Sequence, residues 1–287
     1  MGKAMTGSQP WPAPAKLNRF LHITGRRADG MHELQTLFQF LDYGDALTFE
    51  LLDDSRIMHR TPLAGVDPGE DLTIRAARLL QKAAECSRGA AIHIDKRLPM
   101  GGGLGGGSSD CATTLVALNR LWGLDWALER LAELGLQLGA DVPVFVRGEA
   151  AWAEGVGEVL TAVDLDEPWF LVIRPDCEVS TGQVFNAPDL TRSTPPMTIR
   201  GFLDGAGHND CEPVVRALFP PVGEALDWLN ERATAWLTGT GACIFAAFAT
   251  HAAAANVAAA LPRRWQGFVA RGLNQSPLRQ RLQQEIS

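Results

Sequence analysis

The chain has 287 residues, 46% of them hydrophobic, and a formal net charge of −7. A chain of this length and apolar content can bury a sizeable core, and we expect two domains. The negative charge argues against a nucleic-acid surface, although it allows a local basic pocket for an anionic small molecule. No apolar run reaches the length of a membrane span, and residues 1–10 hold no signal-peptide core. We therefore expect a soluble, cytoplasmic protein.

The cysteines argue against two further classes of protein. They are widely spaced and never form C-x-x-C pairs, and there are five of them: Cys86, Cys111, Cys177, Cys211 and Cys243. An odd, scattered set predicts neither a disulfide framework nor a zinc site. We expect these residues to fill the core.

The first predicted element is a strand over residues 12–23, whose prolines stand at its start, where no ladder hydrogen bond is lost. Lys16 and Asn18 lie two residues apart and so share one face of this strand. That pair suits a phosphoryl group and a hydroxyl group. The alternative is an edge strand with one solvated face.

A glycine-bounded turn over residues 25–32 comes next. Its last residue, His32, is either a ligand contact or a surface or capping residue. Strands are predicted over residues 34–41 and 46–52, on either side of a turn at Tyr43, Gly44 and Asp45.

A polar loop is predicted over residues 53–69. Asp71 can then cap a helix over residues 72–85, whose apolar stripe belongs to the core. Residues 91–95 alternate between apolar and polar, which predicts a strand that leads into Lys96.

The stretch from Pro99 to Asp110 contains six glycines and lies between that strand and a helical pattern. Glycine backbone can turn successive N–H groups toward one point, and a helix start adds its own unpaired N–H groups, so this arrangement suits phosphate. Ser108, Ser109 and Asp110 are the predicted N-caps of the helix. The alternative is a flexible linker. The stretch matches neither the P-loop pattern, since no lysine follows the glycines, nor the dinucleotide-binding pattern.

A second helix is predicted over residues 126–138 and ends at Gly139. Asp141 follows, at the start of a short turn closed by Pro143. Its carboxylate is either a helix cap or a general base.

The pattern of residue types along the sequence changes near Asp164, so we predict two domains, residues 1–163 and residues 164–287. A loop over residues 180–196 contains Phe185, and a second glycine loop over residues 238–242 is explained by a hairpin turn or by a ligand contact. The remaining predicted elements are strands at 168–175, 234–237, 243–248 and 267–272 and helices at 212–218, 222–232 and 251–260. Mixed helices and antiparallel strands give an α+β class for both halves.

Three motifs in fixed order carry a family resemblance: Pro14 to Asn18, the first glycine stretch with its serines, and Leu237 to Cys243. Together they resemble the GHMP kinase superfamily. The resemblance covers most of residues 11–280. It implies an N-terminal ribosomal-S5-like domain, a C-terminal ferredoxin-like domain and an active site between them.

Within the superfamily the closest resemblance is to members that act on a cytidyl-sugar alcohol. It implies transfer of the γ-phosphoryl group of ATP, with Mg²⁺, to the 2-hydroxyl of a cytidine-diphosphate-linked methylerythritol in the non-mevalonate route to isoprenoids. The expected partners are these two small molecules, with no nucleic acid and no membrane, and the chain is a monomer or a homodimer. Two alternatives stay open: another small-molecule kinase of homoserine or mevalonate type, and a nucleotide sensor without chemistry.

The resemblance also assigns roles to residues. It makes Asp141 the base and Lys16 its electrostatic partner, while Ser108 or Ser109 is a possible Mg²⁺ ligand. The ATP-binding set is Pro99, Met100, Gly101, Gly102, Gly103, Leu104, Gly105, Gly106, Gly107, Ser108, Ser109, Asp71 and Lys96, and the substrate-binding set is Asn18, Met31, His32, Phe185 and Thr240. His32 would read the cytosine edge, and Phe185 would stack on that ring.

This chain departs from the family pattern at two positions. Met31 stands where relatives have an aromatic residue, so one stacking face is replaced by a flexible apolar contact. Asp71 stands where relatives have asparagine, and an ionised carboxylate can only accept a hydrogen bond from the adenine side.

Overall fold

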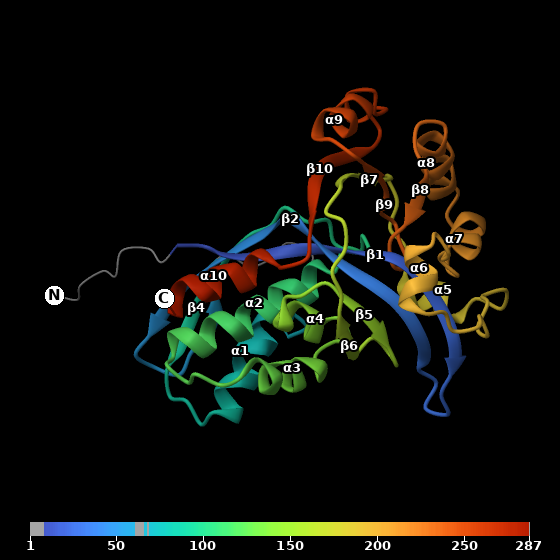
Figure 1. The fold of residues 1–287 in the computed structure, drawn as a ribbon. Coiled ribbons are helices and arrows are strands. Elements are labelled where there is room, and N and C mark those ends of the chain that lie inside the picture. Colours follow the sequence, from blue (N-terminus) through green and yellow to red (C-terminus); the bar gives the residue numbers. More distant parts are fainter. Residues whose placement is uncertain (1–8, 61–65, 68, 287) are drawn as a thin grey trace.

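The computed structural model describes residues 9–60, 66–67 and 69–286. Helices and strands are mixed throughout the chain, which confirms the α+β class (Figure 1). Residues 1–8, which form most of the polar start, lie outside the described residues, as do residues 61–65 and 68 of the predicted loop. Among the described residues, no helix is both long and apolar enough to cross a membrane.

The N-terminal half is a sheet with helices packed against it. Its strands are β1 (Trp11–Arg26), β2 (His32–Leu52), β3 (Ile57–His59), β4 (Gly89–Asp95), β5 (Ala151–Glu154) and β6 (Val159–Ala162). Its helices are α1 (Leu72–Ala83), α2 (Gly106–Leu121), α3 (Leu128–Leu136) and α4 (Val142–Arg147). The long β2 pairs antiparallel with β1, β4 and β5, while β3 joins β4 in parallel and β6 joins β5. Figure 1 shows the four helices gathered on one side of these strands.

The predicted turn at Tyr43, Gly44 and Asp45 is wrong, because β2 runs without a break from His32 to Leu52. Gly44 is needed for a different reason. A Cβ on it would lie 2.2 Å from the carbonyl oxygen of Ala13 on β1. The glycine therefore marks a close approach of two strands, beside a shift in their register between Pro14 and Lys16.

The C-terminal half has its own strands and helices. The strands are β7 (Trp169–Arg174), β8 (Ala235–Leu237), β9 (Ile244–Phe248) and β10 (Gln266–Leu273). The helices are α5 (Thr181–Asn186), α6 (Ile199–Leu203), α7 (Glu212–Leu218), α8 (Pro220–Asn230), α9 (His251–Ala259) and α10 (Pro277–Ile286). Strand order in the sheet is β10, β7, β9 and β8, all antiparallel. The hairpin predicted around residues 238–242 is confirmed as the β8–β9 connection.

Strand β10 joins the two halves, since it pairs with β7 along most of its length and with β2 through Gly272 and Leu273. Helix α10 then packs against β1, α2 and α4, so the end of the chain lies on the N-terminal half (Figure 1). The division at residues 1–163 and 164–287 stays a prediction.

Each half has a buried apolar core, and a smaller third cluster joins them. That third cluster contains Leu17 of β1, Leu104 of the first glycine stretch, Phe170 of β7 and Cys243 beside β9. The first glycine stretch is therefore anchored where the two halves meet.

Candidate active site

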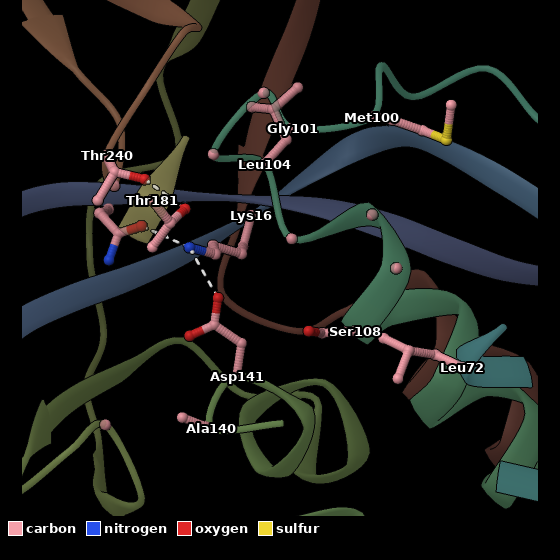
Figure 2. Close-up of a pocket in the computed structure, with 18 of the residues that line it drawn as sticks. Lys16, Leu72, Met100, Gly101, Leu104, Ser108, Ala140, Asp141, Thr181 and Thr240 are labelled. Atoms are coloured by element: carbon pink, nitrogen blue, oxygen red, sulfur yellow. Dashed lines mark hydrogen bonds and ion pairs between the residues drawn. The ribbon is translucent and has the colours of Figure 1, made fainter. Parts of the chain in front are cut away.

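A cleft of about 770 Å³ lies over this junction, lined by β1, both glycine loops and the starts of α2, α4 and α5. Figure 2 shows Lys16 in its floor, with Asp141 on one side and Thr240 on another. Every residue that the sequence predicted for catalysis, ATP or substrate lines this cleft except Ser109.

Lys16 and Asp141 meet in the cleft, as the resemblance implied. The Lys16 ammonium lies 3.2 Å from Oδ2 of Asp141, and the two side chains are 4% and 34% exposed. It also donates to Oδ1 of Asn18 at 2.5 Å and lies 5.1 Å from the centre of the Phe38 ring. Because a buried cation of this kind needs partners, Asp141 and Asn18 hold its charge at one point.

The capping role considered for Asp141 is not what its side chain does. Asp141 stands at the N-cap position of α4, yet its carboxylate makes no capping hydrogen bond. Pro143 near the start of the helix removes one N–H that would need a partner. The carboxylate is left free to face Lys16 and the cleft (Figure 2).

Asn18 is held from both ends of its side chain. Its Oδ1 accepts from Lys16, and its Nδ2 donates to Oγ1 of Thr36 at 2.9 Å. Its backbone N–H donates to Oγ1 of Thr238 at 3.0 Å. Asn18 therefore fixes the lysine in place, and its predicted contact with substrate stays a prediction.

The first glycine stretch is shaped by its neighbours rather than being a flexible linker. The backbone N–H of Lys16 donates to the Leu104 carbonyl at 3.0 Å. A Cβ on Gly103 would lie 2.3 Å from the Thr238 carbonyl oxygen, and a Cβ on Gly105 would lie 2.6 Å from the Phe145 ring. Both glycines have φ of +74°, in the left-handed region that disfavours other residues.

Helix α2 begins earlier than predicted. Its first residue is Gly106 and its N-cap is Gly105, so Ser108, Ser109 and Asp110 all lie inside the helix and their predicted role as N-caps is wrong. Since no side chain caps this end, the first N–H groups of the helix open onto the cleft. This arrangement can bind an anion through the backbone alone.

The second glycine loop packs against the first. Cys243 donates its N–H to the Gly102 carbonyl at 3.1 Å, and Oγ1 of Thr238 donates to the Gly103 carbonyl at 3.3 Å. Thr240 reaches the cleft, where its hydroxyl lies 2.9 Å from that of Thr181 on α5 (Figure 2). Thr181 carried no signal in the sequence, because it is one threonine in a polar loop.

Asp71 caps α1, which confirms that prediction: Oδ1 accepts from the backbone N–H groups of Thr73 and Ile74. Its other oxygen lies 2.8 Å from Nε2 of His59. Burial alone would raise the pKa of this carboxyl, but the hydrogen bonds from His59 and Thr73 outweigh it and hold the pKa well below its usual range. The predicted adenine contact of Asp71 would have to compete with these bonds.

Lys96 lies between two acids at the entry to the first glycine stretch. Its ammonium is 2.6 Å from Oδ2 of Asp45 and 2.7 Å from Oδ2 of Asp110. Burial would lower the pKa of Lys96, but the charges of Asp110 and Asp45 raise it above its usual value. Asp45 also accepts from the N–H groups of Arg97 and Leu98, so this cluster sets the path of the chain into the glycines.

His32 and Phe185 form a ring pair at another end of the cleft, with centroids 5.0 Å apart and planes at 25°. A third ring between them would need about 7 Å, twice the normal contact distance. No base therefore fits between the two rings, and a base that His32 contacts along its edge would lie beside the His32 ring, on the same face of Phe185. Met31, beside them, is exposed. Arg192, which the sequence did not single out, donates to Nε2 of His32 at 3.2 Å.

The two serines differ. Ser108 lines the cleft and is drawn near Asp141 in Figure 2. Ser109 is fully buried; its N–H donates to the Gly105 carbonyl, and its hydroxyl has no partner among the described residues. The described residues hold no cluster of three or more His, Cys, Asp or Glu that could bind a metal by itself. Mg²⁺ is commonly held by a few protein oxygens and by phosphates, and of the two predicted serines only Ser108 has its hydroxyl in a residue that lines the cleft.

Comparisons with known proteins give the class. Residues 71–149 match the family model described as GHMP kinases N terminal domain, and residues 195–267 match GHMP kinases C terminal. The chain therefore belongs to the GHMP kinases, with both characteristic domains, and the glycine stretch lies inside the first match.

Full-length relatives narrow this further. The chain is 59% identical to 4-diphosphocytidyl-2-C-methyl-D-erythritol kinase of Nitrosococcus oceani, over 93% of this chain and 96% of that protein. It is 57% identical to the enzyme of the same name from Pseudomonas paraeruginosa, over 95% and 96%. A crystal structure of 4-(cytidine 5'-diphospho)-2C-methyl-D-erythritol kinase has a TM-score of 0.80 at 31% identity, covering 92% of this chain and 99% of that one. The chain belongs to the 4-diphosphocytidyl-2-C-methyl-D-erythritol kinase family.

Proposed function

We propose that this protein transfers the γ-phosphoryl group of ATP to the 2-hydroxyl of 4-diphosphocytidyl-2-C-methyl-D-erythritol. The observation that carries the proposal is the Lys16–Asp141 ion pair, 3.2 Å long, in a cleft walled by a glycine loop and an uncapped helix start. Family membership supports the choice of substrate. The proposal includes a place in isoprenoid synthesis by the non-mevalonate route and a cytoplasmic location.

Phosphoryl transfer depends mostly on positioning and on neutralising charge. In the proposed reaction Asp141 accepts the proton of the acceptor hydroxyl as the new bond forms. Lys16, held by Asn18, faces the same point and balances negative charge there. Both residues belong to one chain, so this pair forms without a second subunit. That the protein is a monomer or a homodimer stays a prediction.

The N–H groups of Gly106, Gly107 and Ser108 would bind the phosphates, since the first turn of a helix has no internal acceptors for them. Mg²⁺, held by the phosphates and by the Ser108 hydroxyl, would supply further neutralisation of charge. At the other end of the cleft, His32 and Phe185 would receive the cytosine ring, with Met31 as an apolar neighbour.

The test is a coupled assay of ADP release with purified protein, ATP, Mg²⁺ and the cytidyl substrate. Asp141→Asn should lower kcat by about 10² or more, the usual effect of losing general acid–base help, and leave the KM for ATP nearly unchanged. Near-normal turnover of this variant would remove Asp141 from the mechanism.

The same assay separates the alternatives. Equal efficiency with homoserine or mevalonate would favour a different small-molecule kinase and would contradict a cytosine site at His32 and Phe185. Binding of both ligands without ADP release would indicate a sensor. The Lys16–Asp141 pair disfavours that reading, since a sensor has no use for a base at the acceptor.

A further inference from the structure

Arg192, in the loop between α5 and α6, organises one end of the cleft through four hydrogen bonds. Its Nη2 donates to the carbonyls of Phe185 at 2.9 Å and Ala187 at 2.7 Å. Its Nη1 donates to the Leu190 carbonyl at 3.1 Å, and its Nε donates to Nε2 of His32 at 3.2 Å. One side chain thus ties the C-terminal end of α5 to the first residue of β2.

These bonds determine the state of His32. A guanidinium has only donors and does not lose its proton in proteins. Nε2 of His32 must therefore accept, and in the neutral ring the proton stands on Nδ1. A second proton on Nε2 would break the bond and set two cations side by side.

The surroundings of His32 favour the same state. Burial, followed by the charges of Arg192 and Arg26, lowers its pKa from the usual value. Arg26 lies opposite His32 in the pairing of β1 with β2. Arg27 nearby is paired with Glu33 at 3.3 Å and with Glu158 at 3.7 Å, so its charge is largely balanced.

We propose that Arg192 is a specificity-determining positioning residue: it holds His32 as the tautomer protonated on Nδ1 and fixes that ring against Phe185 for a planar base. The base then meets a prearranged ring pair instead of two mobile side chains. This inference rests on the proposed function for the identity of the base, although the state of His32 can be measured without it.

Two variants separate geometry from charge. Arg192→Gln removes the charge and the set of four bonds, whereas Arg192→Lys keeps the charge but cannot span acceptors in four directions. Arg200→Gln is the matched control, because Arg200 on α6 is exposed and pairs only loosely with Asp204, at 3.8 Å. Thermal unfolding of all three establishes that each variant is folded.

The first measurement is NMR of histidine-labelled protein, with the His32 signals assigned by their loss in His32→Gln. Wild type should show a neutral ring protonated on Nδ1. The titration midpoint of His32 should rise by about half a pH unit or more in Arg192→Gln, less in Arg192→Lys and not at all in the control. A wild-type ring protonated on Nε2, or a midpoint unchanged in Arg192→Gln, would overturn the proposal.

The second measurement is steady-state kinetics. Both Arg192 variants should raise the KM for the cytidyl substrate about 10-fold, with kcat and the KM for ATP within a factor of about two. In Arg192→Gln that KM should rise further as pH falls through the raised pKa of His32. Equal rises in both KM values would instead mean a general loss of structure and would overturn the proposal. Inactive wild-type protein with the expected NMR result would refute the proposed function and leave the role of Arg192 in setting the state of His32 intact.

Discussion

Gly105→Ala tests whether the first glycine stretch is a shaped loop or a flexible linker. In the structure φ at Gly105 is +74°, and a Cβ there would lie 2.6 and 2.8 Å from two atoms of the Phe145 ring and 3.1 Å from Cε of Lys16. The left-handed conformation costs an alanine about 1–2 kcal/mol. Crowding a buried ring costs about 1–3 kcal/mol more, because Phe145 is fully buried and cannot move aside.

Together these effects lower the free energy of unfolding by about 2–5 kcal/mol, a large part of the roughly 5–15 kcal/mol typical of folded proteins. The assay is urea unfolding followed by circular dichroism. Two controls share the sequence context. The first is Gly101→Ala. Gly101 has φ of +66°, and a Cβ there would meet no atom within 4 Å, so only the conformational cost of about 1–2 kcal/mol applies.

Gly107→Ala is the second control. A Cβ there would meet only Cδ1 of Leu72, at 3.5 Å, and the residue lies in the first turn of α2. Alanine should therefore be neutral for stability or slightly stabilising. If Gly105→Ala is no less stable than Gly101→Ala, the packing argument is refuted. If the stretch were a flexible linker, all three substitutions would change the free energy of unfolding equally.

The remaining predictions concern a buried acid and the thiols. The pKa of Asp71 is lower in the folded protein than in the unfolded chain, where it is about 3.9. Ionised Asp71 therefore stabilises the fold at pH values above about 3.9, and this stabilisation is lost as the pH falls toward the pKa of the folded protein. At pH 6 the free energy of unfolding in urea should be lower for Asp71→Asn than for wild type by about 1 kcal/mol or more. This difference should become smaller below about pH 3.9. A difference that does not change with pH would contradict the argument. Burial raises the pKa of the Cys211 and Cys243 thiols to about 12, so these thiols should resist alkylation in the native protein. The half-buried Cys86 and Cys177 should be alkylated first, as measured by mass spectrometry of digests of the alkylated protein. Labelling of Cys243 before Cys86 would refute this order.

Local signals in the sequence were reliable where one element explains them. The cap at Asp71 needs only the next three residues, and the helix that it starts was predicted within two residues of its observed end. The helical period likewise predicted α7 over its observed residues. Helix α4 was predicted only as a short turn, and helices α5 and α6 and strands β3, β5 and β6 were missed, because segments of three to six residues show too little periodicity. Helix α10 was also missed, being largely polar.

The errors arose where a local pattern had a distant cause. Gly44 was predicted to form a turn, yet glycine is needed there because the Ala13 carbonyl on another strand leaves no space for a Cβ. Ser109 read as a cap and a ligand, yet the helix starts at Gly106 and buries it. For Arg192 there was no signal at all, since its partner His32 lies in a different half of the chain.

The amino-acid sequence alone determined the kinds of groups available: a backbone rich in glycine for an anion, one lysine and one acid with a family context. Backbone freedom and side-chain chemistry are properties of each residue, so they can be read without coordinates. Only the tertiary structure decided that the ammonium of Lys16 and the carboxylate of Asp141 stand 3.2 Å apart. It also decided that this carboxylate makes no capping hydrogen bond to α4. Electrostatic and hydrogen-bond energies depend on distance and burial, and both are set by how β1, α4 and the two glycine loops pack together.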